Sequence, residues 1–170
     1  MGKQSSKTVY IVQAATIAAL YAALTYIISP LSYGATQLRF SEALTILPVF
    51  TPAAIPGLAI GCLISNIGSP LGLADIFFGT FATLISAVLT RKTKNILVKK
   101  IPVLSPAFPV IFNSFFVGIE FCFFVEETAN ILLFLTTFLS VASGEFLVCY
   151  LLGIPLYFGI KKTNLFKGNE

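Results

Sequence analysis

The stretch ILLFLTTFLSVASGEFLVCYLLGIPLYFGI, residues 131–160, decides the fold class of this chain. It carries a single charged residue, Glu145, and about 20 apolar residues are enough for a helix to cross a bilayer. The whole chain has the same character: 56% of its 170 residues are hydrophobic, 11% are charged, and the mean hydropathy is +0.92. This composition is typical of membrane proteins. We therefore predict one all-α, polytopic membrane domain over residues 1–170.

Five further apolar stretches outside this segment predict a bundle of six transmembrane helices. The expected spans are residues 8–28, 39–50, 54–67, 75–90, 108–124 and 131–160. The second is too short to cross as an α-helix at about 1.5 Å per residue, so we expect it to be tilted, buried or continuous with the preceding loop. Gly144, Gly153 and Pro155 would allow the long last span to bend.

The basic residues are concentrated in three places and predict the orientation. Ten of the eleven Lys and Arg residues lie near the N-terminus, in residues 91–100, or near the C-terminus. Because short loops rich in Lys and Arg stay in the cytoplasm, both termini and this loop are expected there. We also expect a short basic amphipathic segment on the membrane surface within residues 91–106. Glu126 and Glu127 are expected in an outer turn.

Charged residues at membrane depth are the main functional signal. Such a charge costs about 2.5–3.5 kcal/mol on insertion scales, so it is rarely kept without a role. The predicted topology puts all of them in the outer half or the middle of the bilayer, together with two asparagines, so we expect them to converge on a pocket that opens to the outside. The candidate substrate-binding residues are Arg39, Glu42, Asn66, Asp75, Asn113, Glu120 and Glu145.

This group contains one arginine and four carboxylates, and the excess of negative charge limits the kind of ligand that can bind. Arg39 and Glu42 are three residues apart and could pair with each other, and Asp75 could instead cap its own helix. Glu120 and Glu145 have no basic residue at their depth and are the strongest ligand candidates. Carboxylates accept paired N–H groups, so a cation or a heterocycle with a guanidine-like edge would suit this pocket better than an anion.

Several classes of protein are disfavoured by what the sequence lacks. There is no histidine and no GxxxxGK[ST] nucleotide-binding motif, and no lysine lies at membrane depth to activate a serine, which argues against an intramembrane hydrolase. We expect no enzymatic activity, no cofactor and no metal; Cys62, Cys122 and Cys149 lie in apolar runs and are interpreted as buried hydrophobic residues. A stand-alone proton-coupled carrier that uses Glu120 or Glu145 remains an alternative to an uptake subunit.

Small residues form two adjacent rows along the first expected span. Rows of this kind let helices approach each other closely, either within the chain or on a partner subunit. Both interpretations remain open at this point. The rows are Ala14, Ala18 and Ala22, and beside them Ala15, Ala19 and Ala23.

Several motifs resemble the QueT family over nearly the whole chain. They are LRFSEALTILP at residues 38–48, Phe50 with Pro52, Pro56 and Gly57, GCLISN at 61–66, DIFFGT at 75–80, and Gly144-Glu145. The resemblance implies a six-helix substrate-binding S-component of an energy-coupling factor (ECF) transporter in a bacterial plasma membrane, which takes up queuosine precursors or queuine, all 7-deazaguanine bases. It also implies a membrane-embedded coupling protein and two ATPases as partners, with the alanine rows meeting the coupling protein.

Overall fold

The computed structural model describes residues 6–33, 37–125, 130–163 and 166, which form helices and the loops between them. The elements are α1 (Ser6–Ile27), α2 (Ser29–Ser32), η1 (Phe40–Val49), α3 (Ala54–Asn66), α4 (Leu73–Lys92), α5 (Ala107–Glu120), η2 (Phe121–Val125), α6 (Ile131–Phe146), η3 (Leu147–Leu152) and α7 (Gly153–Thr163). The all-helical prediction is confirmed. The expected turn with Glu126 and Glu127 lies outside the described residues.

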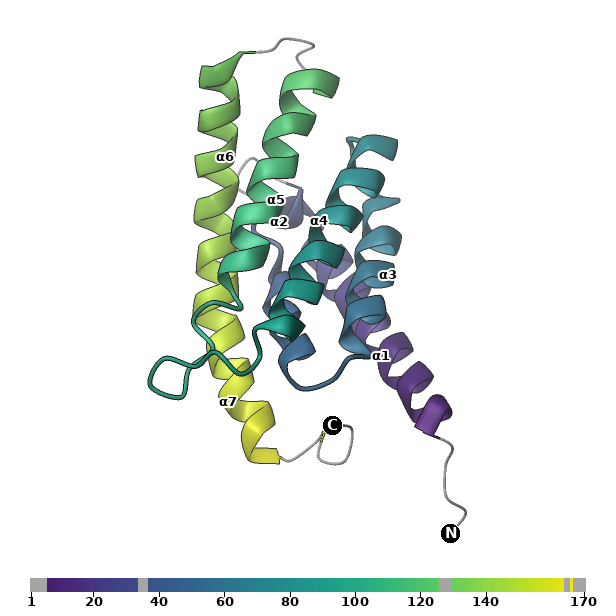
Figure 1. Cartoon of the computed structure of the whole chain (residues 1–170). Coiled ribbons are helices and arrows are strands. Elements are labelled where there is room, and N and C mark those ends of the chain that lie inside the picture. The colour runs from purple at the N-terminus through teal and green to yellow at the C-terminus, as the bar shows by residue number, and fades with distance from the viewer. Residues whose placement is uncertain (1–5, 34–36, 126–129, 164–165, 167–170) are drawn as a thin grey trace.

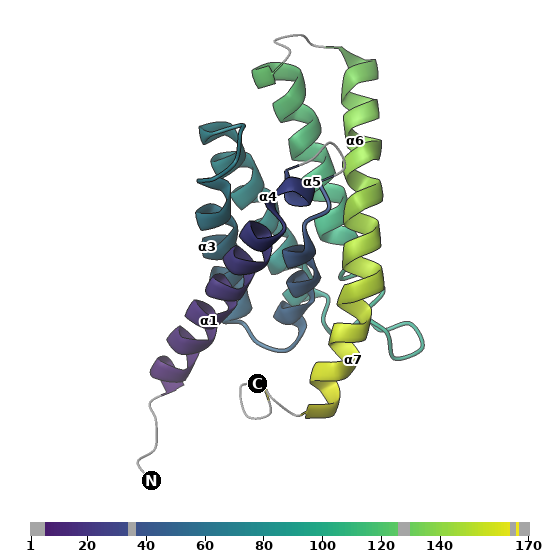
Figure 2. The same ribbon diagram turned by 180° about the vertical axis from the view of Figure 1, so that it is seen from behind.

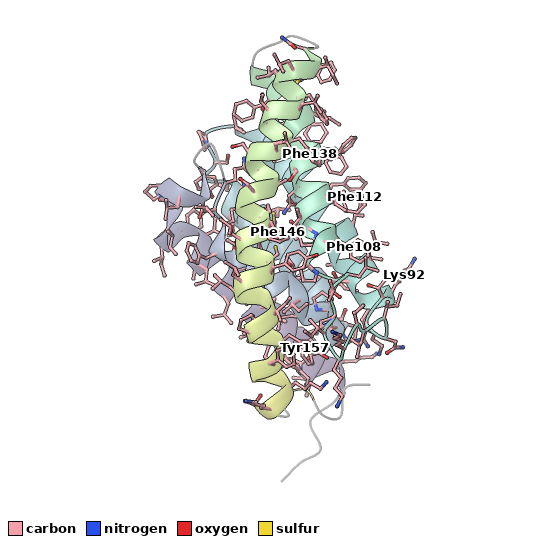
Figure 3. The ribbon with its side chains drawn as sticks, turned by 90° about the vertical axis from the view of Figure 1, so that its left-hand side faces the viewer. Lys92, Phe108, Phe112, Phe138, Phe146 and Tyr157 are labelled. Atoms are coloured by element: carbon pink, nitrogen blue, oxygen red, sulfur yellow. The ribbon has the colours of Figure 1, made fainter. Side chains whose placement is uncertain are left out.

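Within the described residues, four helical segments are long and apolar enough to cross a membrane. They are Lys7–Ile27, Leu73–Lys92, Ala107–Phe124 and Ile131–Thr163, and two shorter apolar helices, Phe40–Val49 and Ala54–Asn66, accompany them. The beginning of α1 and the end of α7 lie at the same end of the bundle (Figure 1). Aromatic side chains line the face formed by α5 and α6, including Phe108, Phe112, Phe138 and Phe146 (Figure 3).

The short helix η1 lies at the centre of the bundle. It packs against α1, α3, α4 and α7, and Figure 2 shows it between α1 with α3 on one side and α6 with α7 on the other. It is a 3₁₀-helix of 10 residues rather than an α-helix, and most of its side chains are buried. A 3₁₀-helix rises about 2.0 Å per residue, so η1 covers roughly 20 Å, more than the α-helix assumed from the sequence would cover. The prediction that this segment is buried is confirmed.

Close packing of α1 on α3 occupies one of the two alanine rows. A Cβ atom at Gly57 would lie 2.8 Å from the Ala14 carbonyl oxygen, and one at Gly61 would lie 2.9 Å from that of Ala18. A larger residue at Gly57 or Gly61 would therefore clash with α1. Ala18 and Ala22 of α1 are buried. Of the two interpretations that the sequence left open, packing within the chain applies to this row, because α3 lies against it. In the neighbouring row Ala15, Ala19 and Ala23 are exposed.

The loop between α4 and α5 differs from the prediction. Residues 93–106 contain no helix, so a basic amphipathic segment here is not helical. The chain instead makes a tight hairpin, in which Val98 and Ile101 are joined by an isolated antiparallel bridge. Pro102 and Pro106 interrupt the segment, and proline removes the backbone donors that a helix needs.

Candidate functional site

The first buried cluster is an ion pair between η1 and α4. Arg39 donates from Nη2 to Asp75 Oδ2 at 3.0 Å and from Nε to the Ser32 carbonyl oxygen at 3.3 Å. The expected pairing of Arg39 with Glu42 is therefore wrong. So is the expected helix cap, because α4 begins after Gly72 without any side-chain cap and Asp75 points to Arg39.

Asn66 joins the end of α3 to the start of α4 beside this ion pair. Its Nδ2 atom donates to the Asp75 carbonyl oxygen at 2.8 Å, while its buried Oδ1 atom has no hydrogen-bond partner in the described part of the chain. A Cβ atom at Gly79 would lie 2.5 Å from Asn66 Nδ2. A glycine at this position therefore leaves room for the asparagine. The free Oδ1 atom is an available acceptor at this site.

The second cluster contains two carboxylates that no described basic residue contacts. One carboxylate oxygen of Glu42, one of Glu145 and the Cys149 Sγ atom all lie within 4.8 Å of one another, and all three residues are buried. Neutral groups surround them: Asn113 Nδ2 donates to Glu145 Oε1 at 3.1 Å, Cys149 Sγ donates to Glu145 Oε2 at 3.5 Å, and the Tyr21 hydroxyl donates to Glu42 Oε1. Glu42 Oε2 has no partner among the described residues. The arrangement could accept a proton, a metal ion or the cationic group of a ligand.

Glu120 forms a third acidic position. It is fully buried at the end of α5, and neither of its carboxylate oxygens has a hydrogen-bond partner within the described residues. Two free oxygens on one buried carboxylate match a ligand that offers two parallel N–H groups. The sequence-based choice of Glu120 as a carboxylate without a basic partner agrees with this geometry.

π-Helical turns adjoin two of these carboxylates. Glu120 directly precedes η2, and Glu145 lies two residues before η3. Short π-helical insertions are rare and are frequent at functional sites, because they shift side chains out of the regular helical register. The irregular helices therefore coincide with the acidic positions on both α5 and α6.

The described residues form a cavity of about 430 Å³. This volume is within the usual range for small-molecule sites. Its wall includes Asp75 from the ion pair, Phe121, which follows Glu120 in the sequence, and Val141, which lies one helical turn before Glu145. The lining residues are Tyr33, Gln37, Ser69, Pro70, Leu71, Asp75, Phe121, Thr136, Thr137, Ser140 and Val141.

The predicted polar residues are all buried, but they do not form one group. Arg39, Asp75 and Asn66 form one cluster, Glu42, Glu145 and Asn113 form another, and Glu120 has no described partner. Sequence reasoning missed two members. Cys149 was interpreted as a hydrophobic residue, although it follows Glu145 by four positions and so lies on the same helical face. Tyr21 lies on α1, and no local pattern links it to Glu42.

Comparison with known proteins identifies the family. The sequence model described as QueT transporter matches residues 11–162. The chain belongs to the QueT family. The QueT resemblance noted from the motifs is thus confirmed, and the chain is a multi-pass membrane protein of a transporter family.

One curated relative of this QueT chain has a specific name. Over 84 residues the chain is 40% identical to a protein named Queuosine precursor transporter QueT from Lactococcus lactis subsp. cremoris (strain MG1363). The alignment covers 48% of this chain and 49% of that relative, so it spans about half the length of each. No solved structure matches the chain significantly.

Proposed function

We propose that this protein is the substrate-binding membrane subunit of an importer for queuosine precursors or queuine, the 7-deazaguanine bases. The name of the Lactococcus relative supports the substrate class. The observation that carries the proposal is Glu120, whose two buried oxygens have no hydrogen-bond partner among the described residues and suit the N–H edge of a guanine-like base.

The buried polar groups have complementary tasks in this proposal, and Asp75 is the one of them that lines the cavity described above. Glu120 accepts the guanidine-like edge of the base, and Asn66 Oδ1 accepts a further N–H group. Glu42 and Glu145 contribute the negative field that excludes anions, and Asn113 of α5 donates to Glu145 of α6. Arg39 and Asp75 neutralise each other and hold the cavity wall in position.

Ligand binding to the purified protein tests this proposal directly. A ligand at about a hundred times its dissociation constant stabilises the folded state by about 2.7 kcal/mol, which a thermal-shift measurement detects. We expect stabilisation by queuine or its deazaguanine precursors, weaker stabilisation by guanine and none by anionic vitamins. Stabilisation by an anionic vitamin but by no deazaguanine would refute the assignment.

We further propose that the chain works as an ECF S-component with six passes and cytoplasmic termini. The absence of a nucleotide-binding motif means that ATP would act through partner ATPases. The exposed row of Ala15, Ala19 and Ala23 is the part of α1 left for the coupling protein. Ala19→Trp should lower co-purification with the coupling protein but spare ligand binding, whereas Leu139→Trp, on the exposed face of α6, serves as the matched control.

A stand-alone proton-coupled carrier is the second candidate. The close carboxylates Glu42 and Glu145 favour it, because such a pair can hold and release a proton. Uptake of labelled queuine by liposomes that contain only this chain separates the two functions. Concentrative uptake driven by a proton gradient alone would establish the carrier and exclude the requirement for ATPases.

A further inference from the structure

The hairpin between α4 and α5 is a basic and apolar surface that the proposed transport function does not use. Residues 91–106 contain five basic residues and no acidic residue. Ile96, Leu97 and Val98 are 54%, 41% and 58% exposed, which is unusual for three consecutive large apolar side chains in a loop. Lys99 and Lys100 follow directly and are exposed as well.

The turn of this hairpin holds its two lysines in an unusual backbone conformation. Val98 N–H donates to the Ile101 carbonyl oxygen at 2.9 Å, and Ile101 N–H donates back to that of Val98 at 3.0 Å. Lys99 and Lys100 occupy the two central positions with φ values of 49° and 68°. Two-residue turns of this type normally use Asn-Gly or other residues that tolerate positive φ. Two lysines here are poor turn formers, and they place two consecutive basic residues at the tip of the hairpin.

The base of the hairpin is fixed to the bundle, so its position is defined. Thr90 Oγ1 donates to the Ser105 carbonyl oxygen at 3.3 Å, and the Tyr150 hydroxyl donates to that of Val103 at 3.0 Å. Arg91 Nη1 donates to the carbonyl oxygens of Pro48 and Val49, both at 3.2 Å. These contacts connect the loop to α4, η3 and the end of η1.

The hairpin extends sideways from the bundle rather than along its long axis. Figure 1 shows it beyond α7, and the view from behind in Figure 2 shows the same projection. Lys92, at the end of α4, lies at the outer edge of the molecule (Figure 3). Because the helices on both sides of the loop are long and apolar enough to cross a membrane, a loop that extends sideways between them would lie along the membrane surface.

We propose that residues 94–104 form a binding site for anionic phospholipids of the cytoplasmic leaflet. The apolar side chains of Ile96, Leu97 and Val98 enter the acyl boundary, while Lys99 and Lys100 bind lipid phosphates. An anionic lipid supplies both the apolar and the negative partner that this surface needs.

A tryptophan reporter tests this site cleanly, because the chain has no tryptophan of its own. The Val98→Trp variant is reconstituted in bilayers that contain brominated phosphatidylcholine or brominated phosphatidylglycerol, and fluorescence quenching gives the relative binding of the two lipids. We expect quenching by both lipids and a clear preference for phosphatidylglycerol. Val103→Trp, on the returning arm of the loop, is a second reporter should Val98→Trp fold poorly.

Lysine replacement identifies the source of the preference. A lysine near an anionic membrane surface contributes about 1 kcal/mol, which is about a fivefold preference for phosphatidylglycerol over phosphatidylcholine. Replacing both with Lys99→Gln/Lys100→Gln should therefore reduce this lipid preference by up to about twenty-fivefold. Lys161→Gln/Lys162→Gln removes the same charge from the end of α7 and should leave the preference unchanged. The Leu139→Trp reporter on α6 should be quenched equally in all backgrounds.

Four results would overturn the proposal. The first is water-like emission without quenching in either lipid, and the second is equal quenching by the two lipids. The third is an equal loss of preference in both lysine pairs. The fourth is a lysine effect that occurs only when the coupling protein and ATPases are present, which would assign the hairpin to a protein partner.

Discussion

The ion pair of Arg39 with Asp75 and the acidic positions at Glu42, Glu145 and Glu120 are equally buried but differ in charge balance. The first pair is neutral within the chain, with a direct contact of 3.0 Å. The others have only neutral donors, and Glu120 has no described donor at all. Burying an unpaired charge is costly, so the compensated pair is best explained by stability and the uncompensated carboxylates by binding.

Breaking the ion pair should give the largest change in the free energy of unfolding. Arg39→Met leaves Asp75 buried without a cation, and removal of one partner from such a pair typically costs about 3–5 kcal/mol. Denaturant unfolding in detergent measures this loss of stability. The double variant Arg39→Met/Asp75→Leu should recover most of it, since no unpaired charge then remains. A single variant as stable as the parent would show that the pair is not structural.

Neutralising Glu120 should produce the opposite pattern. Glu120→Gln removes a carboxylate that has no described partner, so the free energy of unfolding should stay the same or rise. Binding of a deazaguanine should weaken by about 1.5–3 kcal/mol, roughly ten- to hundredfold, because a charge-assisted contact is lost. Calorimetric titration measures the affinity. Unchanged affinity would direct the search to Glu145 and Glu42.

Removing the neutral Asn113 donor to Glu145 should give the smallest of these effects, and it should act on the free energy of unfolding. Asn113→Leu leaves Glu145 Oε1 without its amide donor, for which we expect a loss of about 1–2 kcal/mol in the free energy of unfolding. Ser114→Ala on the same helix is the control, because its hydroxyl bonds only to the Val110 carbonyl oxygen of the preceding turn. Equal losses in both variants would mean that the Asn113 contact adds nothing specific.

The polar side chains could be found from the sequence, but not their partners. Each of the seven predicted residues is buried, as charge and amide groups in apolar runs indicated. Arg39 was expected to pair with Glu42 on its own helix, where the 3.6-residue period brings positions three apart together. Arg39, however, is the N-cap residue of η1 and has an extended backbone, so helical spacing does not apply to it and its side chain reaches α4 instead. A local rule could not reveal a contact between helices.

The sequence by itself determined that the chain is helical, apolar and membrane-spanning, because hydropathy and chain length act locally and need no knowledge of neighbours. Its QueT motifs also determined the family. Only the tertiary structure decided which alanine row is buried, since that depends on the two glycines of α3 facing α1. It likewise decided which carboxylates are neutralised: a buried charge is compensated by whatever lies within a few ångströms, and packing rather than sequence order sets that distance.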